Sequence, residues 1–580
     1  MRAKYHTAPH PVWEIGVPVL AGILGLSTLQ QNLQSLLSPM FGGTLVAAQL
    51  SQARDICTLL AAAITTQQYG RARSISNLCW GMGISLILPM ICARQIASFM
   101  SIACGKQGAL WTIQILLFPP TLIGSVLCER CISARASDCD AFWQRRLQRG
   151  AVIIAYFTFA ARSKQFFHAF ESELLGENAP GILIAMSSLT LLFSGYNHRF
   201  RKASCGLLPF AQTVLIALLM LTVTVKRDFP ILDHASNIRI LNSTQSSTGR
   251  IVVGDNLSLG YRFLRCDHSL LGGRWIQEKE SGETKLGESI FATFVLQEIG
   301  RLVALPTMEQ VQVPVAEIIG LGAGISADAL SRHGYRLRII EIDPAVYHAT
   351  KTYFNLEAFQ KVNVEDGFHS VTKRARQIKK GGSDYNLEDL ADLVIHDCFT
   401  GGSVPIALYT EQFWSDLTLS IKATGHLVVN FAGVIESEIS RAILRTLWHS
   451  FPQCRVFEDQ FGPSGEFQAG SLKNVVFVCS MSHSPLLTFR PATRTDLLES
   501  PLRAHVFSHF LSREVLPDHF INESEEEEAL NSGSKSGRLT TKFLLESEHS
   551  SSFRKWKMDS AIATWEAMRE IMPVKAWAAY

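Results

Sequence analysis

The sequence predicts an all-α polytopic membrane domain at the N-terminus, followed by a doubly wound, Rossmann-like α/β domain with a small β-hairpin region in front of it. Three observations lead to this fold class. Long charge-free apolar runs fill the chain before Lys226, apolar strands alternate with helices after Val315, and a glycine-rich turn joins a strand to a helix within Glu317–Pro344. A chain of 580 residues also exceeds the size at which one hydrophobic core keeps growing, so several domains are expected.

The first domain, residues 1–228, is expected to cross a membrane about six or seven times, because a spanning helix needs about 20 mainly apolar residues. Two segments, Ile56–Gly70 and Gly150–Ala161, are short for a span, which leaves the number open. A buried all-helical domain is the alternative reading. The long charge-free runs are Ile15–Ala53, Ser74–Ala93, Gln107–Cys128, Asn178–His198 and Ala203–Val225.

The sidedness of the membrane domain follows from its loops. Basic residues gather in alternate loops, as around Arg71 and Arg201, and the positive-inside tendency places such loops in the cytoplasm. Seven spans would leave the C-terminal half on the opposite side, whereas six place it in the cytosol, where a nucleoside cofactor is expected. We therefore predict a multi-pass membrane protein with a cytosolic catalytic domain. Glycosylation at the N-x-S/T sequons of Asn242, Asn256 and Asn522 would instead show that the C-terminal half lies on the lumenal side.

Charge and cysteine content exclude two classes of partner. A formal net charge of +3 is small for this length and argues against nucleic-acid binding. No metal is predicted, because Cys128, Cys131 and Cys139 lack an accompanying histidine or second CxxC pair. The cysteines of the C-terminal half are isolated in the sequence and are expected to be reduced, structural thiols: Cys266, Cys398, Cys454 and Cys479.

The sequence pattern of residues 235–310 predicts a β-hairpin followed by a helix. Arg250–Gly254 and Tyr261–Cys266 alternate like short strands, and LLGG, Leu270–Gly273, is interpreted as a turn. Glu288–Leu305 has apolar residues at helical spacing and is followed by Pro306.

Residues 311–515 are predicted to form the doubly wound domain. Their near-continuous apolar strands suit a sheet covered by helices on both faces. The last two of its strands are expected to form an antiparallel hairpin at the sheet edge. An acidic, Ser-rich linker is predicted for 516–552 and a C-terminal helix for 553–580, with Phe553–Met572 amphipathic. The predicted strands are Ala316–Ile319, Leu337–Ile342, Lys361–Val364, Leu393–Asp397, His426–Phe431, Cys454–Glu458 and Val475–Cys479.

The glycine turn is the strongest functional signal. Gly320, Gly322 and Gly324 let the backbone turn tightly and let a ligand approach it, while Glu341 at the end of the next strand is placed to bind ribose hydroxyls. This pattern predicts a site for a nucleoside-containing cofactor. A nicotinamide-dependent dehydrogenase shares the pattern but leaves the hairpin and the HDCFTGG segment without a role.

Five ordered blocks carry a family resemblance: YRFLRCDHSLLGG, GESIFATF, GLGAGIS with EIDP, EDGFHSV, and LVIHDCFTGGSVPIALYTEQFW. Together, from about Arg250 to Glu458, they resemble the spermidine synthase superfamily, which has the class I S-adenosylmethionine-dependent transferase fold, and the whole chain looks like a membrane-fused member. The resemblance implies Asp397 as the catalytic carboxylate and places Asp267, Glu288 and Thr400 near the substrate. Tyr409 could line the acceptor pocket. For the cofactor it implies Gly320, Gly322, Gly324, Glu341, Asp343, Asp366 and Gly367.

The departures from the family pattern bear on the reaction. The second aspartate of the strand-end block is replaced by Thr400, a helix tyrosine by Phe291, and the aspartate of the glycine loop by Ala323. Each buried ammonium of a polyamine needs an anion or several acceptors, so these losses weaken a polyamine site. His396 is expected to point away from Asp397, because strand side chains alternate.

We therefore predict a membrane-anchored transferase that uses S-adenosylmethionine or its decarboxylated form and moves a methyl group to a small-molecule amine or hydroxyl. Asp397 would receive the proton of the acceptor. Aminopropyl transfer to a polyamine is the second reading, and a noncatalytic ligand-sensing membrane protein is the third. The expected partners are the lipid bilayer and the small-molecule acceptor, and a homodimer is left open.

Overall fold

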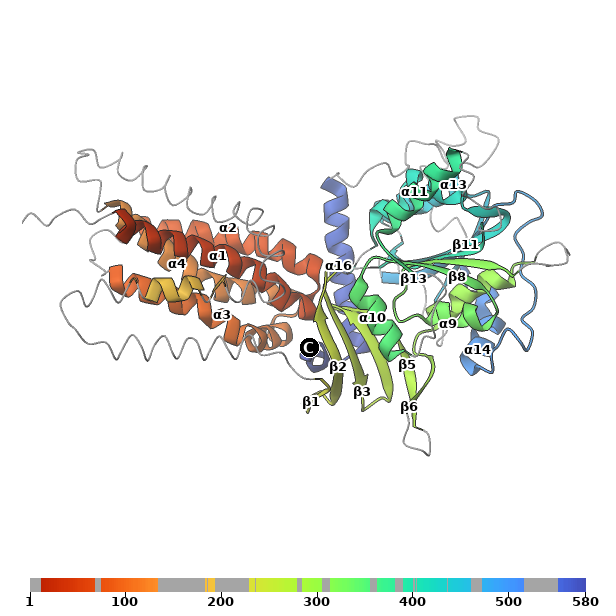
Figure 1. The fold of residues 1–580 in the computed structure, drawn as a ribbon, viewed down its shortest axis with the longest axis horizontal. Helices are drawn as coiled ribbons and strands as arrows, with labels where there is room; N and C mark the ends of the chain where they lie inside the picture. The colour runs from red at the N-terminus through yellow and green to blue at the C-terminus, as the bar shows by residue number, and fades with distance from the viewer. Residues whose placement is uncertain are drawn as a thin grey trace, which may run out of the picture. The chain divides into compact units, whose positions relative to one another are not determined.

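The computed structural model describes residues 12–67, 75–133, 183–184, 186–192, 194, 229–234, 236–278, 284–304, 313–354, 362–380, 390–399, 402, 404–435, 437–459, 472–515 and 551–580. The chain forms two compact units, residues 1–228 and 229–580 (Figure 1).

The N-terminal unit is helical where it is described. Its long helices are α1 (Val12–Phe41), α2 (Gly43–Gln67), α3 (Ile75–Ala103) and α4 (Gly108–Ser133). The first apolar run is divided between α1 and α2 at Gly42, whose φ of 83° is accessible to glycine. Most of the run Asn178–His198, and all of Gly150–Ala161 and Ala203–Val225, lie outside the described residues.

Two segments of the described part of this unit, Ile75–Ala103 and Gly105–Glu129, are long and apolar enough to cross a membrane. A signal sequence or a buried core helix can meet the same criterion, so the multi-pass arrangement stays a prediction.

The C-terminal unit begins with an antiparallel sheet in the order β1-β2-β3-β4-β5-β6. The interpretation of LLGG as a turn is wrong. The chain turns instead at Asp267 and His268, where Asp267 has a φ of 48°, and Leu270–Gly273 continues as strand. Gly272 is needed for close packing, because a Cβ there would lie 2.8 Å from the Cβ of Ala323. The strands are β1 (Ile231–Asp233), β2 (Ile238–Gln245), β3 (Arg250–Asn256), β4 (Tyr261–Cys266), β5 (Ser269–Glu278) and β6 (Thr284–Ser289).

The helix predicted over Glu288–Leu305 is shorter and starts later. Glu288 belongs to β6, and the helix consists of α8 (Ala292–Leu296) followed by the 3₁₀ segment η3 (Gln297–Leu302). Position 305 lies outside the described residues.

The second sheet has the order β14-β12-β13-β11-β10-β7-β8-β9, with β9, β8, β7, β10 and β11 parallel and β13 antiparallel to both its neighbours. The hairpin expected from the last two predicted strands is present, but β13 lies between β11 and β12, and β14 forms the edge of the sheet beyond β12. The strands are β7 (Val315–Ile319), β8 (Arg336–Glu341), β9 (Val362–Val364), β10 (Ala391–His396), β11 (Ile421–Val434), β12 (Gln453–Glu458), β13 (Leu472–Ser480) and β14 (Glu514–Val515).

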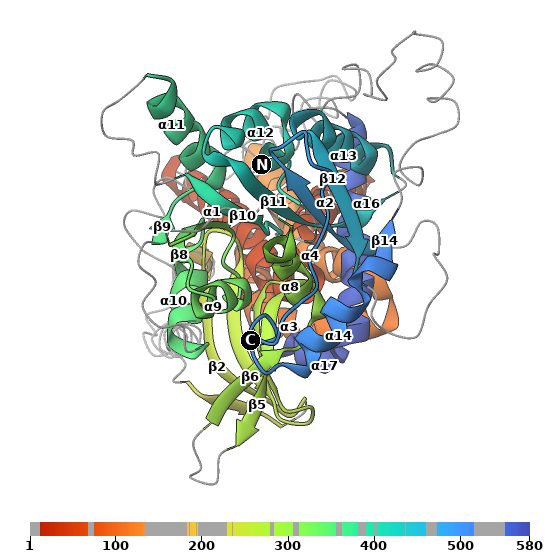
Figure 2. The ribbon, with the colours of Figure 1, turned by 90° about the vertical axis from the view of Figure 1, so that its right-hand side faces the viewer.

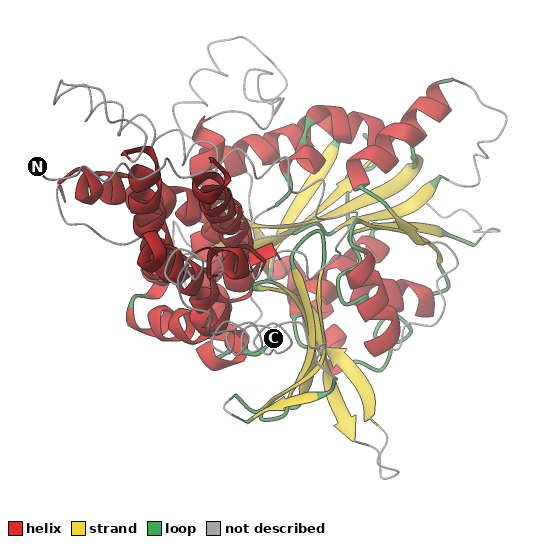
Figure 3. Cartoon of the chain, turned by 60° about the vertical axis from the view of Figure 1, so that its left-hand side comes forward, coloured by secondary structure: helices red, strands yellow, loops and turns green. Residues whose placement is uncertain are grey.

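Helices cover both faces of this sheet, as its apolar strands predict (Figure 2). Because successive strand residues point to opposite faces, Val394 packs with α11 (Gly367–Lys379), α12 (Glu411–Thr418) and α13 (Glu438–Ser450) on one face. Leu393 and Ile395 pack on the other face with η3, α9 (Ile325–Arg332) and α14 (Pro501–His509). The doubly wound α/β fold is therefore present, and Figure 3 shows the two sheets in yellow with their helices in red.

A third apolar cluster joins the two sheets. Ile251 and Val253 of β3 pack against Val346 and Ala349 of α10 (Pro344–Tyr353), the helix that follows β8. This packing brings the antiparallel sheet next to the carboxyl ends of the parallel strands.

Two cysteines predicted to be reduced form a disulfide, so that prediction is wrong for Cys454 and Cys479. They face each other in the antiparallel β12–β13 pair with a Cα–Cα distance of 4.1 Å, which brings their side chains together. Disulfides are typical of oxidising compartments and rare in the cytosol, so this bond is at odds with the predicted cytosolic location.

The C-terminal helix is present as α16 (Ser551–Ile571), followed by the short α17 (Val574–Ala578). The linker predicted for 516–552 lies outside the described residues except for its last positions, which begin α16. Trp556 joins the core under α13, and the hydroxyls of Ser560 and Thr564 donate to the Gly402 carbonyl at 3.3 and 3.0 Å.

Candidate active site

A cavity of about 420 Å³ lies at the carboxyl ends of the parallel strands. In open α/β sheets this edge is where ligands bind, because the strand ends and the following loops leave a crevice there. The strand order sets the residues of the cavity in one row: Asp366 after β9, Glu341 on β8, Gly320 after β7, Asp397 after β10, Asn430 on β11, Asn474 on β13 and Asp459 after β12.

The glycine turn forms the floor of one half of the cavity. Gly320 and Gly322 have φ values of 93° and 51°, and both line the cavity. A Cβ on Gly320 would lie 2.1 Å from the Asp397 carbonyl oxygen, and one on Gly322 would lie 2.6 Å from the Leu271 carbonyl oxygen. Glycine is thus required here both for backbone conformation and for space. Gly324, with a φ of 72°, begins α9 and does not itself line the cavity.

Glu341 closes β8 beside this turn. One carboxylate oxygen accepts from the Leu321 N–H and the other from the Asp343 N–H, each at 2.9 Å. Burial raises the pKa of Glu341, while these hydrogen bonds act in the opposite direction. Each oxygen keeps a lone pair for a ligand, as a ribose-binding acid requires.

Three further predicted cofactor residues line the same half of the cavity. Asp343 caps α10 by accepting from the Ala345 N–H at 2.8 Å, and it also accepts from the Ser246 hydroxyl at 2.6 Å. Asp366 caps α11 by accepting from the His369 N–H at 2.8 Å, and Gly367 follows it. These contacts give Asp343 and Asp366 structural roles at the cavity wall.

This half of the cavity fits an adenosine-containing cofactor. The tight turn leaves open the space that Cβ atoms at Gly320 and Gly322 would fill, and Glu341 provides acceptors for hydroxyls. Ile340 and Ile342 add apolar surface beside them.

Asp397 lies at the centre of the row, between the two halves of the cavity. Asn430 Nδ2 donates to one of its carboxylate oxygens and Gln297 Nε2 to the other, both at 2.8 Å. Gln297 is fully buried and is itself held by the Ser326 hydroxyl at 2.7 Å. Burial raises the pKa of Asp397, and the two amides oppose that rise. The carboxylate is therefore fixed in position and suited to taking up a proton.

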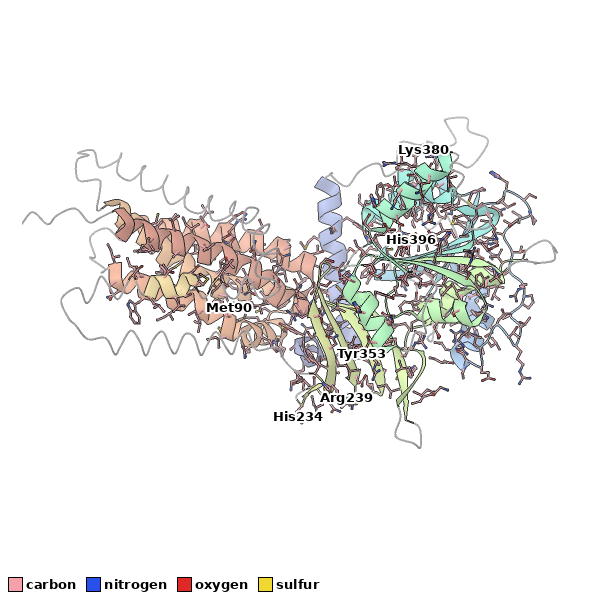
Figure 4. The ribbon with its side chains drawn as sticks, in the orientation of Figure 1. Met90, His234, Arg239, Tyr353, Lys380 and His396 are labelled. Atoms are coloured by element: carbon pink, nitrogen blue, oxygen red, sulfur yellow. A yellow bond between two sulfur atoms is a disulfide. The ribbon has the colours of Figure 1, made fainter. Side chains whose placement is uncertain are left out.

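His396 and Tyr409 belong to the core. His396 points away from the cavity, as predicted, with its ring 4.9 Å from that of Tyr409, and burial lowers its pKa to about 3. Figure 4 labels His396 within the sheet layer. Tyr409 is fully buried and donates to the Asn430 carbonyl at 3.2 Å, and it is not among the described residues that line the cavity.

The other predicted substrate residues are not brought to the cavity. Asp267 is buried in the β4–β5 turn, where its carboxylate accepts from the Arg250 N–H at 2.9 Å. Glu288 accepts from the Leu502 N–H at 3.3 Å, at the start of α14. Both contacts fix local structure outside the cavity. Thr400 lies outside the described residues.

Sequence reasoning missed the polar residues beyond Asp397, and it did not place the predicted C-terminal helix at the cavity. Thr293, Asn430, Asn474 and Asp459 line it together with three residues of α16. Asn430 has a signal in HLVVNFA, where one amide interrupts an apolar strand. The α16 residues have no such signal, because only the fold brings them there: Thr564, Met568 and Ile571.

Comparisons with known proteins agree with a transferase. No model of a known protein family matches the chain. An N-terminal histidine N-methyltransferase of Emericella nidulans is 27% identical over 516 residues, which cover 85% of each chain. The prediction of a transferase is confirmed by this relative, and a methyltransferase relative agrees with S-adenosylmethionine as the predicted cofactor.

Spermidine synthases and methyltransferases are among the similar solved structures. A probable spermidine synthase from Corynebacterium glutamicum aligns with a TM-score of 0.33 and 14% identity, over 45% of this chain and 88% of that one. Human methyltransferase-like protein 13 in complex with SAH aligns with a TM-score of 0.25 and 16% identity, over 41% of this chain and 95% of that one.

Proposed function

We propose that this protein is a membrane-anchored N-methyltransferase that moves a methyl group from S-adenosylmethionine to a nitrogen of an N-terminal histidine. The observation that carries the proposal is Asp397, a buried carboxylate held by Asn430 and Gln297 in the same cavity as the glycine turn. The histidine acceptor comes from the relative that aligns over 85% of both chains.

The residues of the chain have three tasks in this reaction. S-adenosylmethionine, when bound, supplies an electrophilic methyl group on a sulfonium. Glu341 and the glycine turn would hold its adenosine portion. The lone pair of one imidazole nitrogen would attack, so that the N–C bond forms as the S–C bond breaks and the cofactor leaves as its thioether. Asp397 would accept a hydrogen bond from the N–H of the other ring nitrogen and take that proton. Phe291 and Phe399 line the cavity and exclude water from the reacting groups.

A polyamine acceptor is less well supported by the geometry. Aminopropyl transfer would use Asp267 and Glu288 as additional ammonium partners, but these carboxylates are engaged by backbone N–H groups elsewhere. A small-molecule amine or hydroxyl, predicted from the sequence, stays the alternative acceptor, since Asp397 would serve it in the same way. A noncatalytic ligand sensor would not need the Asp397 carboxylate to be fixed by two amides.

Membrane anchoring is supported by the surface of α3. Large apolar side chains repeat at helical spacing along one side of this helix and are about half exposed or more: Ile84, Leu88, Ile91, Phe99 and Ile102. In water such a stripe costs free energy, whereas lipid would cover it. The number of spans, the cytosolic side of the catalytic unit and a homodimer stay predictions.

The test is methyl transfer by the full chain in detergent. Purified protein, labelled S-adenosylmethionine and a short peptide with a free N-terminal histidine should give a peptide heavier by one methyl group. The same peptide with an added N-terminal alanine should stay unmodified, and Asp397→Asn should lose at least 100-fold in kcat while still binding cofactor. Equal labelling of both peptides, or product with putrescine and decarboxylated cofactor alone, would contradict the proposal.

A further inference from the structure

A second carboxylate, Asp459, stands at the far end of the cavity from the cofactor half. It directly follows β12, and its backbone N–H donates to the Asn474 carbonyl of β13 at 3.0 Å. Strands β11 and β13 separate it from Asp397, which directly follows β10. The cavity therefore has a carboxylate at its centre and another at its end.

Side-chain hydrogen bonds connect the two carboxylates. Asn474 Nδ2 lies 3.4 Å from Asp459 Oδ2 and 2.5 Å from the Thr293 hydroxyl, which donates to Asn430 Oδ1 at 3.4 Å. Asn430 Nδ2 in turn reaches Asp397. The two amides and the hydroxyl between them fix the separation of the two acids along one wall of the cavity.

The surroundings of Asp459 suit a cationic ligand group. Burial raises the pKa of this carboxyl to about 7, although hydrogen bonds from Asn474 and Thr293 lower it, and the negative charge of Glu458 adds a smaller rise. A carboxylate in such a place is stabilised by an ion pair with a cation. The neighbouring Lys473 donates to Glu458 at 3.0 Å.

We propose that Asp459 binds the protonated α-amino group of the acceptor histidine, while Asp397 receives the imidazole. This inference rests on the proposed function and adds the orientation of the substrate. A protonated amine has no lone pair with which to attack a methyl group, whereas a neutral imidazole has one, and at neutral pH the α-amine is mostly protonated and the imidazole mostly neutral. The cation is therefore held at the end of the cavity and the nucleophile at its centre.

This arrangement makes Asp459 a specificity residue for a free N-terminus. An internal histidine has an amide where the N-terminal one has an ammonium, so it cannot form an ion pair with Asp459. The enzyme would bind such acceptors more weakly and discriminate against them.

The experiment compares two peptides and three proteins. One peptide has a free N-terminal histidine, and the other begins with imidazolepropionyl, which lacks only the α-amine. Wild type, Asp459→Asn and Asp392→Asn are assayed as full chains in detergent. Asp392 is a matched control, because it is half-buried in β10, pairs with Lys422 at 2.8 Å and does not line the cavity.

We expect Asp459→Asn to raise KM for the free-amine peptide about 10-fold or more and to change kcat by less than about 3-fold. Wild type should show a similar rise in KM when the amine is removed from the peptide, and the variant should show no further rise. Asp392→Asn should behave like wild type.

Two results would overturn this inference and leave the proposed function standing. One is an unchanged KM in Asp459→Asn, and the other is an equal rise of its KM for both peptides. Failure of wild type to methylate either peptide would overturn the proposed function together with it. If Asp459→Asn loses cofactor binding, the wild-type enzyme still tests the inference with the two peptides. Equal KM values of wild type for both peptides would show that the α-amine is not recognised.

Discussion

Asn430, within β11, donates from Nδ2 at 2.8 Å to Oδ1 of Asp397, the residue that follows the neighbouring parallel strand β10. The register makes this contact, because His396 of β10 pairs with Val429 of β11 and the next residue of each strand is the acid or the amide. The hydrogen bond stabilises the charged form of Asp397 against the cost of burial.

Replacing Asn430 with alanine should move the acidic limb of the kcat profile to higher pH by about one unit, the value of one charge-assisted hydrogen bond. The direction follows because the donor lowers the pKa of Asp397, and its loss raises the pH at which the carboxylate becomes able to take a proton. Gln412→Ala, on α12, should leave the profile in place. A shift toward lower pH would contradict the assignment of Asp397.

Gly320→Ala should abolish cofactor binding, since its Cβ would lie 2.1 Å from the Asp397 carbonyl oxygen. Gly334→Ala is a matched control, because Gly334 also has a positive φ, 80°, but no atom lies within 4 Å of an added Cβ. The control should lose about 1 kcal/mol of stability and keep full binding. Thermal shift with and without S-adenosylmethionine measures both, and equal effects of the two changes would exclude close packing as the reason for Gly320.

Glu341→Gln should weaken S-adenosylmethionine binding about 10-fold, because an amide keeps only one acceptor oxygen and loses the charge that strengthens hydrogen bonds from hydroxyls. Glu365→Gln provides the comparison, as this acid lies next to β9 and accepts from the Ser370 hydroxyl outside the cavity. Calorimetric titration gives both dissociation constants. Unchanged affinity in Glu341→Gln would remove Glu341 from the cofactor site.

The stability of the protein should depend on pH through Asp459. Its folded pKa of about 7 lies above the unfolded value, so its contribution to stability is full below about pH 4 and is lost as pH rises through 7. Asp459→Asn removes this loss and should therefore melt about 2–4 °C higher than wild type at pH 8, with the difference vanishing near pH 4. Melting curves at several pH values are the measurement, and a variant that melts lower at pH 8 would show that the carboxylate is not destabilised by burial.

The disulfide between Cys454 and Cys479 should be detectable in protein purified without reductant. Closing a loop with a sequence separation of 25 contributes about 3 kcal/mol, so reductant should lower the melting temperature of wild type. The double change to alanine should melt lower and no longer respond to reductant. Free thiols at both positions in protein alkylated inside cells would instead agree with the predicted cytosolic location.

Much of the α/β unit could be predicted because its signals are local. The seven predicted strands correspond to β7 to β13, mostly within one or two residues at the ends, since near-continuous apolar segments bounded by polar residues mark buried strands. Gly320, Glu341 and Asp397 can be singled out from the sequence for the same reason: each stands at the end of such a strand or directly after it.

The sequence was less informative where distant segments meet. In LLGG, Gly272 allows a close approach to Ala323, and the sequence alone does not distinguish a glycine with this role from one in a turn. Asp267 and Glu288 were assigned to the substrate by family pattern, but the turn at Asp267 and the start of α14 engage their carboxylates. The disulfide required the register of β12 against β13.

By itself, the sequence determined the element types, the glycine turn and the acids that end the parallel strands, because these depend on hydrophobic period and backbone conformation over a few residues. Tertiary structure decided which polar groups share the cavity. Antiparallel insertion of β13 beside β11 brings Asn474 and Asp459 into line with Asp397, and packing of α16 adds the residues that close the cavity. Such contacts join residues far apart in the chain, so their geometry exists only after the sheet has formed.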